Sequence, residues 1–443
     1  MKSIASQILK LTAQKGIKQA EVFGQTSKEL TIEIARQEVE NLKIAEEQGV
    51  GLRIIFENRL GYAYTADLKK ESLQVLVEKA LANSRLVEAE TAWNIAQPND
   101  KYPQLDLFDL EIGQHSLEEK ISLAQEVEQA ALNYDSRIKQ VEKAVYQDAD
   151  YQLFLYNSYG LEKNYHSAFC GLYSSVISRD QADAQTGFGM DFSLKYADLD
   201  PYKVGREAGE KAVRMLGART ISSAKLPVVF EPYVMVGLLG VLEAIFSGEA
   251  VLKGTSFLAG KVGEKVAGTA VNLIDHGALK GRLGSAPFDG EGMPTQKTSL
   301  IHNGELQGFL HNLYTARKSG TISTGNAVRS GYKSTPEVGV TNFYLEPGKV
   351  SPEELLREIS YGFYVTEVMG LHTANPISGD FSLGAAGLLI ENGEITKPVK
   401  GMALAGNLQA LLKGIDLIAN DLTFYLGQGS PTVRVQGLTL SGI

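Results

Sequence analysis

The sequence is poor in residues that mark several common protein classes. Its 443 residues include one cysteine, Cys170, so the chain cannot form an internal disulfide and fits a reducing compartment. Cys170 lies in an apolar strand-like run, and we expect an inert core thiol. No two of the six histidines are three to five residues apart, which excludes a helical pair of metal ligands. The chain also lacks a GxSxG elbow, a Walker A loop and a GxGxxG that follows a strand.

Positive charge and long apolar runs are scarce as well. The 43 Lys and Arg against 52 Asp and Glu give a formal net charge of −9, whereas sequence-independent binding to nucleic acid needs a basic surface. The longest apolar run, residues 232–251, falls short of the roughly 20 apolar residues of a membrane span. The N-terminus predicts a helix over residues 3–15 instead of a secretory signal. We therefore expect a cytoplasmic protein with no nucleic-acid and no membrane partner.

Hydrophobic periodicity predicts an α+β fold. Short alternating runs over residues 20–65 predict an antiparallel meander, and a helix follows at about 71–86. A capping box opens a second helix over 116–133, and strand-like runs at 138–147, 151–157, 162–178 and 185–193 lead to a helix at 201–217. The order helix, strands, helix occurs roughly twice, which indicates two α+β units and raises the hypothesis of a duplication.

Composition divides the chain into three predicted domains. An N-terminal α+β domain covers residues 1–95, and a central α+β domain covers 110–222 after a linker rich in Pro and Asn. The third domain, 225–443, is rich in glycine and strand patterns and follows a strand into the apolar run 232–251. This run is apolar nearly all round, which predicts a buried central helix.

Two segments of the third domain carry the same hairpin signal. Residues 299–306 and 388–395 each place Asn-Gly between short apolar runs, either as two independent hairpins or as a repeat. Between them, residues 319–334 are polar and contain glycine, so they should form a loop. Such a loop either lines a site or is a mobile surface loop.

A few carboxylates stand out from their surroundings. Glu243 is alone in the apolar run, where an ionised carboxylate is expensive to bury unless it is paired or faces a cleft. Asp289 and Glu291 lie between glycines and could hold a hard cation such as Ca²⁺ or Mg²⁺. More often an Asp in such a sequence bonds its own backbone in a turn, and the same alternatives apply to Asp380.

Several segments together resemble the PmbA/TldD family, once labelled modulators of DNA gyrase. They are LPVVFEP at 226–232, the run 285–327, the run 376–401 and SPTVRVQGLTLSG at 430–442. The resemblance extends over essentially the whole chain, and its most specific part is 285–401.

The TldD branch of this family carries HExxxH on the central helix, with a cysteine near the C-terminus as third ligand, which implies a zinc peptidase. Residues five apart lie roughly 140° apart on a regular helix, so the two His converge only where the helix is widened or interrupted. The aligned hexapeptide here keeps Glu243, but Leu242 and Ser247 replace both His. No cysteine follows Cys170. The chain is thus similar to the PmbA/TldE branch, and we expect it to hold no metal and no other cofactor.

The resemblance implies a subunit of a cytoplasmic metallopeptidase that processes small unfolded peptides, with zinc in a TldD-type partner. This chain would shape the substrate cavity and form a dimer with that partner or with itself. An extended peptide would add as a strand to an exposed edge. Candidate residues of the substrate cavity are Asp289, Asn303, Thr324, Asn326 and Asp380.

Two alternatives stay open. One is a hydrolase with a rearranged site, in which Glu243 acts with His276, His311 or Asp380. The other is a non-enzymatic homodimer that binds or regulates another complex. Glu243 has a purely structural interpretation too, because neither His stands beside it.

Overall fold

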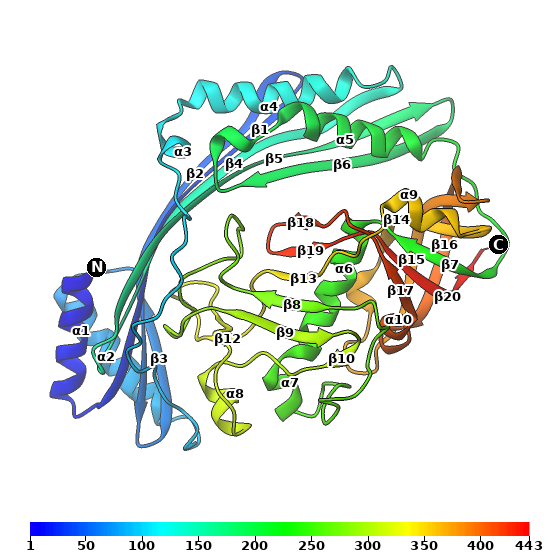
Figure 1. The fold of residues 1–443 in the computed structure, drawn as a ribbon. Coiled ribbons are helices and arrows are strands. Elements are labelled where there is room, and N and C mark those ends of the chain that lie inside the picture. Colours follow the sequence, from blue (N-terminus) through cyan, green and yellow to red (C-terminus); the bar gives the residue numbers. More distant parts are fainter. Residues whose placement is uncertain (443) are drawn as a thin grey trace.

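A single curved antiparallel sheet runs through the first half of the chain in the computed structural model, which describes residues 1–442 (Figure 1). Its strand order is β3-β2-β1-β4-β5-β6. The strands are β1 (Gln19–Ala35), β2 (Glu38–Phe56), β3 (Arg59–Thr65), β4 (Ile138–Asn157), β5 (Glu162–Asp180) and β6 (Asp183–Ser193). The predicted meander is therefore confirmed. The second group of strands joins the first through the pairing of β1 with β4, so the two α+β units share one sheet.

One detail of the predicted first half is wrong. The runs at 138–147 and 151–157 are one strand, β4, because its neighbours β1 and β5 continue across the intervening residues. The helices end close to where periodicity places them: α1 (Lys2–Gln14), α2 (Lys70–Ser84), α4 (Leu117–Leu132) and α5 (Pro201–Arg214), with the short α3 (Leu110–Gln114) in the linker. Helix α4 ends at Leu132 with Asn133 as its C-cap, and the predicted capping box of Ser116 and Glu119 is present.

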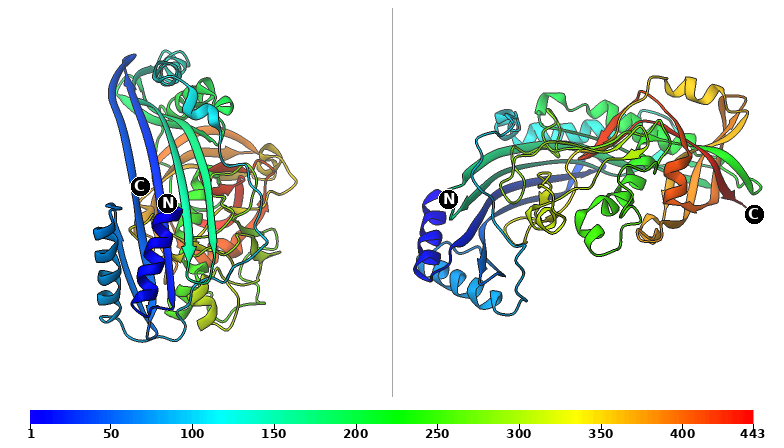
Figure 2. Two further views of the ribbon diagram at one scale, coloured as in Figure 1. Left: turned by 90° about the vertical axis from the view of Figure 1, so that its left-hand side faces the viewer. Right: turned by 60° about the horizontal axis from the view of Figure 1, so that its bottom comes forward.

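All four longer helices cover the same face of the sheet. Side chains alternate between faces along a strand. Ala20 and Val22 of β1 belong to the core beneath α1 and α2, and Ile32 and Ile34, of the same parity, belong to the core beneath α4 and α5. Figure 1 shows the helices on the outer side of the arch and the C-terminal half on the inner side, and Figure 2 shows the curvature from two further directions.

The C-terminal half contains a closed β-barrel and a second six-stranded sheet. The barrel strands follow the order β16-β15-β14-β7-β20, and β16 also pairs with β20 and closes the ring. They are β7 (Ala224–Phe230), β14 (Tyr361–Met369), β15 (Asp380–Glu391), β16 (Glu394–Asn407) and β20 (Val433–Ser441), with β17 (Ile415–Ile418) beside β20. The sheet β10-β9-β8-β13-β19-β18 consists of β8 (Leu273–His276), β9 (Lys297–His302), β10 (Glu305–Leu306), β13 (Phe343–Leu345), β18 (Thr423–Tyr425) and β19 (Gln428–Ser430).

Helix α6 (Pro232–Leu242) lies in the core between these two sheets, as the apolar run predicts. The remaining elements are α7 (Gly248–Leu252), α8 (Leu313–Lys318), α9 (Pro352–Arg357), α10 (Leu408–Gly414) and the two-residue strands β11 (Ala327–Val328) and β12 (Glu337–Val338). Within residues 1–442 we find no helix that combines the length and the apolar character of a membrane span.

Both predicted Asn-Gly hairpins are confirmed. Asn303 and Gly304 join β9 to β10 with φ of 48° and 80°, and Asn392 and Gly393 join β15 to β16 with φ of 54° and 82°. Two-residue turns of this kind need positive φ at both central positions, which Asn and Gly adopt at little cost.

The loop at 319–334 packs its last third against the inner face of the arched sheet. Tyr332 is buried, and its ring lies so close to Gly49 of β2 that any side chain at Gly49 would overlap it. The Tyr62 hydroxyl donates to the Tyr332 carbonyl at 2.5 Å. Gly51 of β2 is needed as well, because a Cβ at Gly51 would overlap the Tyr332 carbonyl oxygen. This part of the loop therefore joins the two halves of the chain and is not a mobile surface loop.

Candidate functional site

The apolar run 232–251 is not one helix. Helix α6 ends at Leu242, a 3₁₀ turn covers Glu243–Phe246, and Ser247 is extended before α7 begins at Gly248. Ser247 caps α7, since its hydroxyl accepts from the Glu249 N–H at 3.2 Å. The break is held from outside: the Leu310 N–H donates to the Phe246 carbonyl, and the Gly248 N–H donates to the Leu310 carbonyl, both at 2.8 Å. The helix is thus interrupted between Leu242 and Ser247 by a tight 3₁₀ turn, and the helix is not widened there.

Glu243 stands at the break, at the edge of a cavity of about 310 Å³. Its carboxylate accepts a hydrogen bond from Gln428 Nε2 of β19 at 2.9 Å. Burial raises the pKa of Glu243 above its usual value, and the Gln428 hydrogen bond opposes that rise. Glu243 is therefore both paired and exposed to a cleft. The cavity is lined by Glu243, Ala244, Ser247, Glu249, Ala250, Lys253, Thr255, Leu310, Val338, Gly339 and Val340.

Asp275 of β8 is a second unusual carboxylate, which sequence reasoning missed. It is 1% exposed, and it accepts from the Thr341 N–H at 2.6 Å and from Asn326 Nδ2 at 2.6 Å. Burial raises its pKa to about 6, and the nearby charge of Glu243 adds to the rise. The signal in the sequence is an Asp inside the apolar strand Leu273–His276.

Asp275 and Asn326 together hold one wall of the cavity. Asn326 bonds Gly339 twice: its carbonyl accepts from the Gly339 N–H at 3.0 Å and its Nδ2 donates to the Gly339 carbonyl at 3.1 Å. Gly339 lines the cavity together with its neighbours Val338 and Val340. Of the five predicted cavity residues, Asn326 is the one that supports this cavity.

The other four predicted residues lie elsewhere. Asn303 is at the exposed tip of the β9–β10 hairpin. Thr324 accepts from the His311 N–H at 2.8 Å, and His311 itself is buried against Gly248 with its pKa lowered by burial. Asp380 begins β15 and is exposed, where it accepts from Asn407. Within residues 1–442, the five predicted residues thus do not lie around one common cavity.

Asp289 forms the backbone-bonding turn that is the common alternative to a cation site. Its carboxylate accepts from the N–H groups of Glu291, Met293 and Ala327 at 2.9, 2.9 and 3.0 Å. Burial and the neighbouring charge of Glu291 raise the pKa of Asp289 to about 7. Every oxygen of Asp289 already has a protein donor, which leaves no obvious role for a cation.

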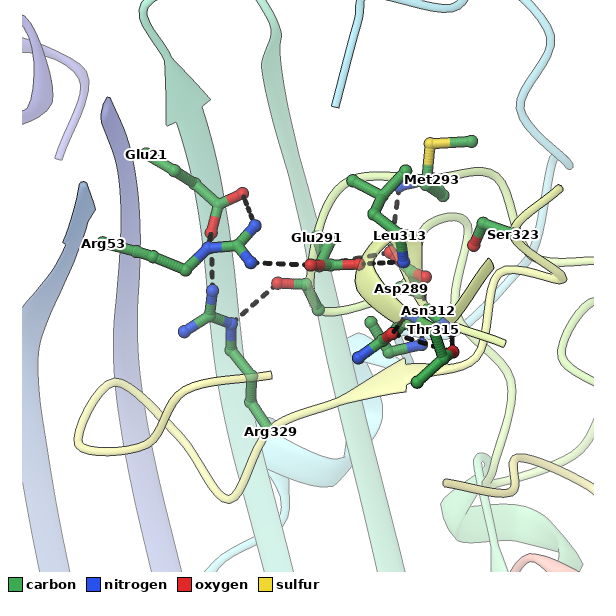
Figure 3. Close-up of polar contacts among 12 residues, drawn as sticks. Glu21, Arg53, Asp289, Glu291, Met293, Asn312, Leu313, Thr315, Ser323 and Arg329 are labelled. Carbon is green, nitrogen blue, oxygen red and sulfur yellow. Dashed lines mark hydrogen bonds and ion pairs between the residues drawn. The ribbon is translucent and has the colours of Figure 1, made fainter. Parts of the chain in front are cut away.

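Glu291 belongs to a buried ionic cluster between the arched sheet and the C-terminal half (Figure 3). Arg53 of β2 bonds Glu21 of β1 through Nε at 3.0 Å and Nη2 at 2.8 Å, and Glu291 through Nη1 at 2.6 Å. Arg329 bonds Glu21 at 2.6 Å. These side chains are at most 2% exposed. Two positive and two negative charges from distant parts of the chain therefore compensate one another.

Comparison with known proteins places this geometry in a family. The family profiles described as PmbA/TldA metallopeptidase domain 1, central domain and C-terminal domain match residues 20–84, 111–216 and 223–442. The chain belongs to the PmbA/TldD metallopeptidase family. It is 31% identical over 408 residues to Metalloprotease PmbA of Escherichia coli O157:H7, covering 91% of this chain and 88% of that protein.

Solved structures of PmbA/TldD relatives share the whole fold. A proposed modulator of a DNA gyrase from Thermotoga maritima superposes with a TM-score of 0.92 at 30% identity, over 99% of this chain and 100% of that one. TldE from Thermococcus kodakarensis superposes with a TM-score of 0.90 at 25% identity, over 99% and 100%.

The metal that the metallopeptidase family implies does not fit the residues at this position. Leu242 has no donor atom and is fully buried in the core, and the Ser247 hydroxyl already caps α7. Cys170 lies in β5, where burial raises the pKa of its thiol to about 12. Across residues 1–442, no three side chains of His, Cys, Asp or Glu come together as a metal site would require.

Proposed function

We propose that this chain is the subunit of a PmbA/TldD-type peptidase that lacks the catalytic metal, and that it shapes the cavity for small unfolded peptides. The observation that carries the proposal is the helix break at Glu243. Both positions that flank the retained Glu lack a free zinc ligand, because Leu242 is apolar and Ser247 is engaged as a cap. Without a bound metal, Glu243 has no metal-activated water on which to act.

In this proposal the zinc belongs to a TldD-type partner in the cytoplasm. Glu243, the Gln428 amide and the wall at Gly339 would border the path of an extended peptide. Such a peptide is bound mainly through its backbone, which places little demand on its sequence. Self-association into a homodimer is the alternative assembly.

A second candidate function rests on the raised pKa values of Glu243 and Asp275, since the charge of Glu243 contributes to the rise at Asp275. Two nearby carboxylates with raised pKa values are typical of acid–base catalysis. Asp275 is enclosed by its own donors, however, and has little access to a substrate. A hydrolase with this rearranged site is therefore the weaker interpretation.

The test compares this chain, a chain with an intact HExxxH motif from the same genome, and their equimolar mixture. Hydrolysis of a fluorescence-quenched unfolded peptide is measured for each. We expect no cleavage by this chain alone and clear cleavage by the mixture. Cleavage by this chain alone that disappears in Glu243→Gln and in Asp275→Asn would favour the rearranged hydrolase. A mixture no more active than the HExxxH chain by itself would contradict the subunit role.

A further inference from the structure

A larger cavity lies between the last strand of the arched sheet and the β18–β19 hairpin. Its volume is about 570 Å³, within the usual range for ligand sites. β6 forms one side, and β18 with the following turn forms the other. Figure 1 shows this hairpin extended beneath β6. The lining comprises Met190–Leu194, Asp198, Lys203, Glu207, Gly281–Leu283 and Leu422–Leu426.

Further aromatic side chains lie near β6, next to this cavity and outside its lining. The Phe188 ring is tilted against the rings of Tyr173 of β5 and Tyr233 of α6, with ring centroids 6.1 and 6.3 Å apart. Tyr233 in turn meets Tyr425 of β18 edge-to-face at 5.1 Å, and Tyr233 is 42% exposed. Aromatic rings that remain accessible beside a cavity offer apolar area to a ligand at low entropic cost.

The hairpin tip carries an apolar residue in a strained conformation. Leu426 has φ of +56° and is 51% exposed, although Asn or Gly is the usual choice for such a turn. Strain of this kind tends to persist where a side chain has a function. The same hairpin contains Gln428, the hydrogen-bond donor to Glu243, so the two cavities share one element.

Arg282 is the cation of this lining that has no carboxylate partner in the described chain. Its guanidinium lies over the Phe424 ring at 4.1 Å, and within residues 1–442 no carboxylate pairs with it. Burial lowers the pKa of Arg282. Of the carboxylates in the lining, Asp191 pairs with Lys203 and Glu207 pairs with Lys211. Asp198 accepts a hydrogen bond from the Ser193 hydroxyl and keeps its charge.

The edge of β6 completes the site. In the described chain β6 pairs with β5 alone, so its other edge offers backbone N–H and carbonyl groups to a further strand. The free edge of β6 can bind an extended backbone. The aromatic side chains Phe188, Tyr233 and Tyr425 can contact apolar side chains, and Arg282 can bind a carboxylate.

We propose that the cavity between β6 and the β18–β19 hairpin binds the C-terminal end of an extended apolar peptide, with the terminal carboxylate on Arg282. This inference rests on the proposed function and adds to it the part of the peptide that is recognised. A terminal carboxylate is present on every unmodified peptide whatever its sequence. A guanidinium binds it through two parallel hydrogen bonds.

The test measures the affinity of the full chain for an N-terminally labelled octapeptide rich in Phe and Leu, by fluorescence anisotropy. The peptide is used as the free acid and as the C-terminal amide. We expect amidation and Arg282→Ala each to weaken binding about tenfold, as loss of a charged hydrogen-bonded pair implies. Arg282→Ala should also bind acid and amide equally, because the two changes remove the same contact. Arg357→Ala, at an exposed arginine of α9, is the matched control and should bind like the unmodified chain.

A second variant separates binding from folding. Leu426→Asn places a residue suited to positive φ at the tip, so the thermal midpoint should stay or rise while the affinity falls. Equal affinity of the unmodified chain for the acid and the amide would overturn the site. An amidated peptide with an internal Glu that binds as tightly as the free acid would overturn it too, because the recognised carboxylate would then not be the terminal one. Self-association that Arg282→Ala abolishes would instead make this cavity an interface between copies and overturn the proposal. None of these outcomes decides the subunit role, which the mixture assay tests separately.

Discussion

Glu243 is a carboxylate in surroundings that oppose its charge. It follows a helix with an apolar core face, and the Gln428 amide is its hydrogen-bond donor. Burial raises its pKa, so the folded protein holds the proton more tightly than the unfolded chain does. By linkage, the free energy of unfolding falls as the pH rises from the unfolded pKa of about 4.5 through the higher folded value, and then levels off.

Glu243→Gln should remove this pH dependence. The neutral amide has no charge to bury, so the variant should unfold at a higher temperature than the unmodified chain at pH 7 to 8. The difference should shrink as the pH falls toward about 4.5. Thermal midpoints of both proteins across this pH range provide the measurement. Glu264→Gln, at an exposed glutamate, is the control and should show no such trend. A difference that grows toward acid pH would contradict the account.

At the scale of elements, the sequence predicts helix caps and hairpin turns, because neighbouring residues determine them. The capping box at Ser116 and the Asn-Gly turns at 303–304 and 392–393 could be read from sequence because neighbouring residues alone satisfy their backbone groups. The helix break at Glu243 could not be predicted from the sequence in this way. It depends on the Leu310 backbone, more than sixty residues away, which bonds to both sides of the break.

Helix α6 should contribute to stability mainly through its buried apolar side chains. Leu239 is fully buried in the core between the two C-terminal sheets, so Leu239→Ala should lower the free energy of unfolding by about 2–5 kcal/mol. Val262, at 56% exposure, is a suitable control, and Val262→Ala should stay within about 0.5 kcal/mol. Chemical denaturation measures both. A loss below about 1 kcal/mol for Leu239→Ala would mean that α6 is not the core of this half.

At the scale of the whole molecule, the joining of the two halves had no signal in the sequence. Glu21, Arg53 and Arg329 look like ordinary charged residues, and the sequence indicates Glu291 only as a candidate cation ligand. The fold alone brings the four together. The union of two predicted α+β units in one sheet is likewise a long-range event, since β1 pairs with β4 across more than a hundred residues. The family resemblance supplied what periodicity could not: the candidate position of Glu243 and the two missing His.

Removal of one charge from this cluster should be strongly destabilising. Arg53→Met leaves Glu21 buried with one cation fewer and Glu291 without an ionic partner, which should lower the free energy of unfolding by about 3–5 kcal/mol. Arg137→Met, which removes a partly exposed pair with Asp135, should cost less than about 1 kcal/mol. Denaturant titration of the two variants gives the comparison. Equal losses would show that the cluster does not hold the halves together.

The zinc content of the purified chain tests the central claim most directly. Equilibrium dialysis against zinc, followed by metal analysis by mass spectrometry, gives the number of ions bound per chain. Because Leu242 and Ser247 provide no free ligand beside Glu243, we predict far less than one zinc per chain, with Glu243→Gln unchanged. One tightly bound zinc per chain that is lost in Glu243→Gln would contradict the account and place a metal centre at the helix break.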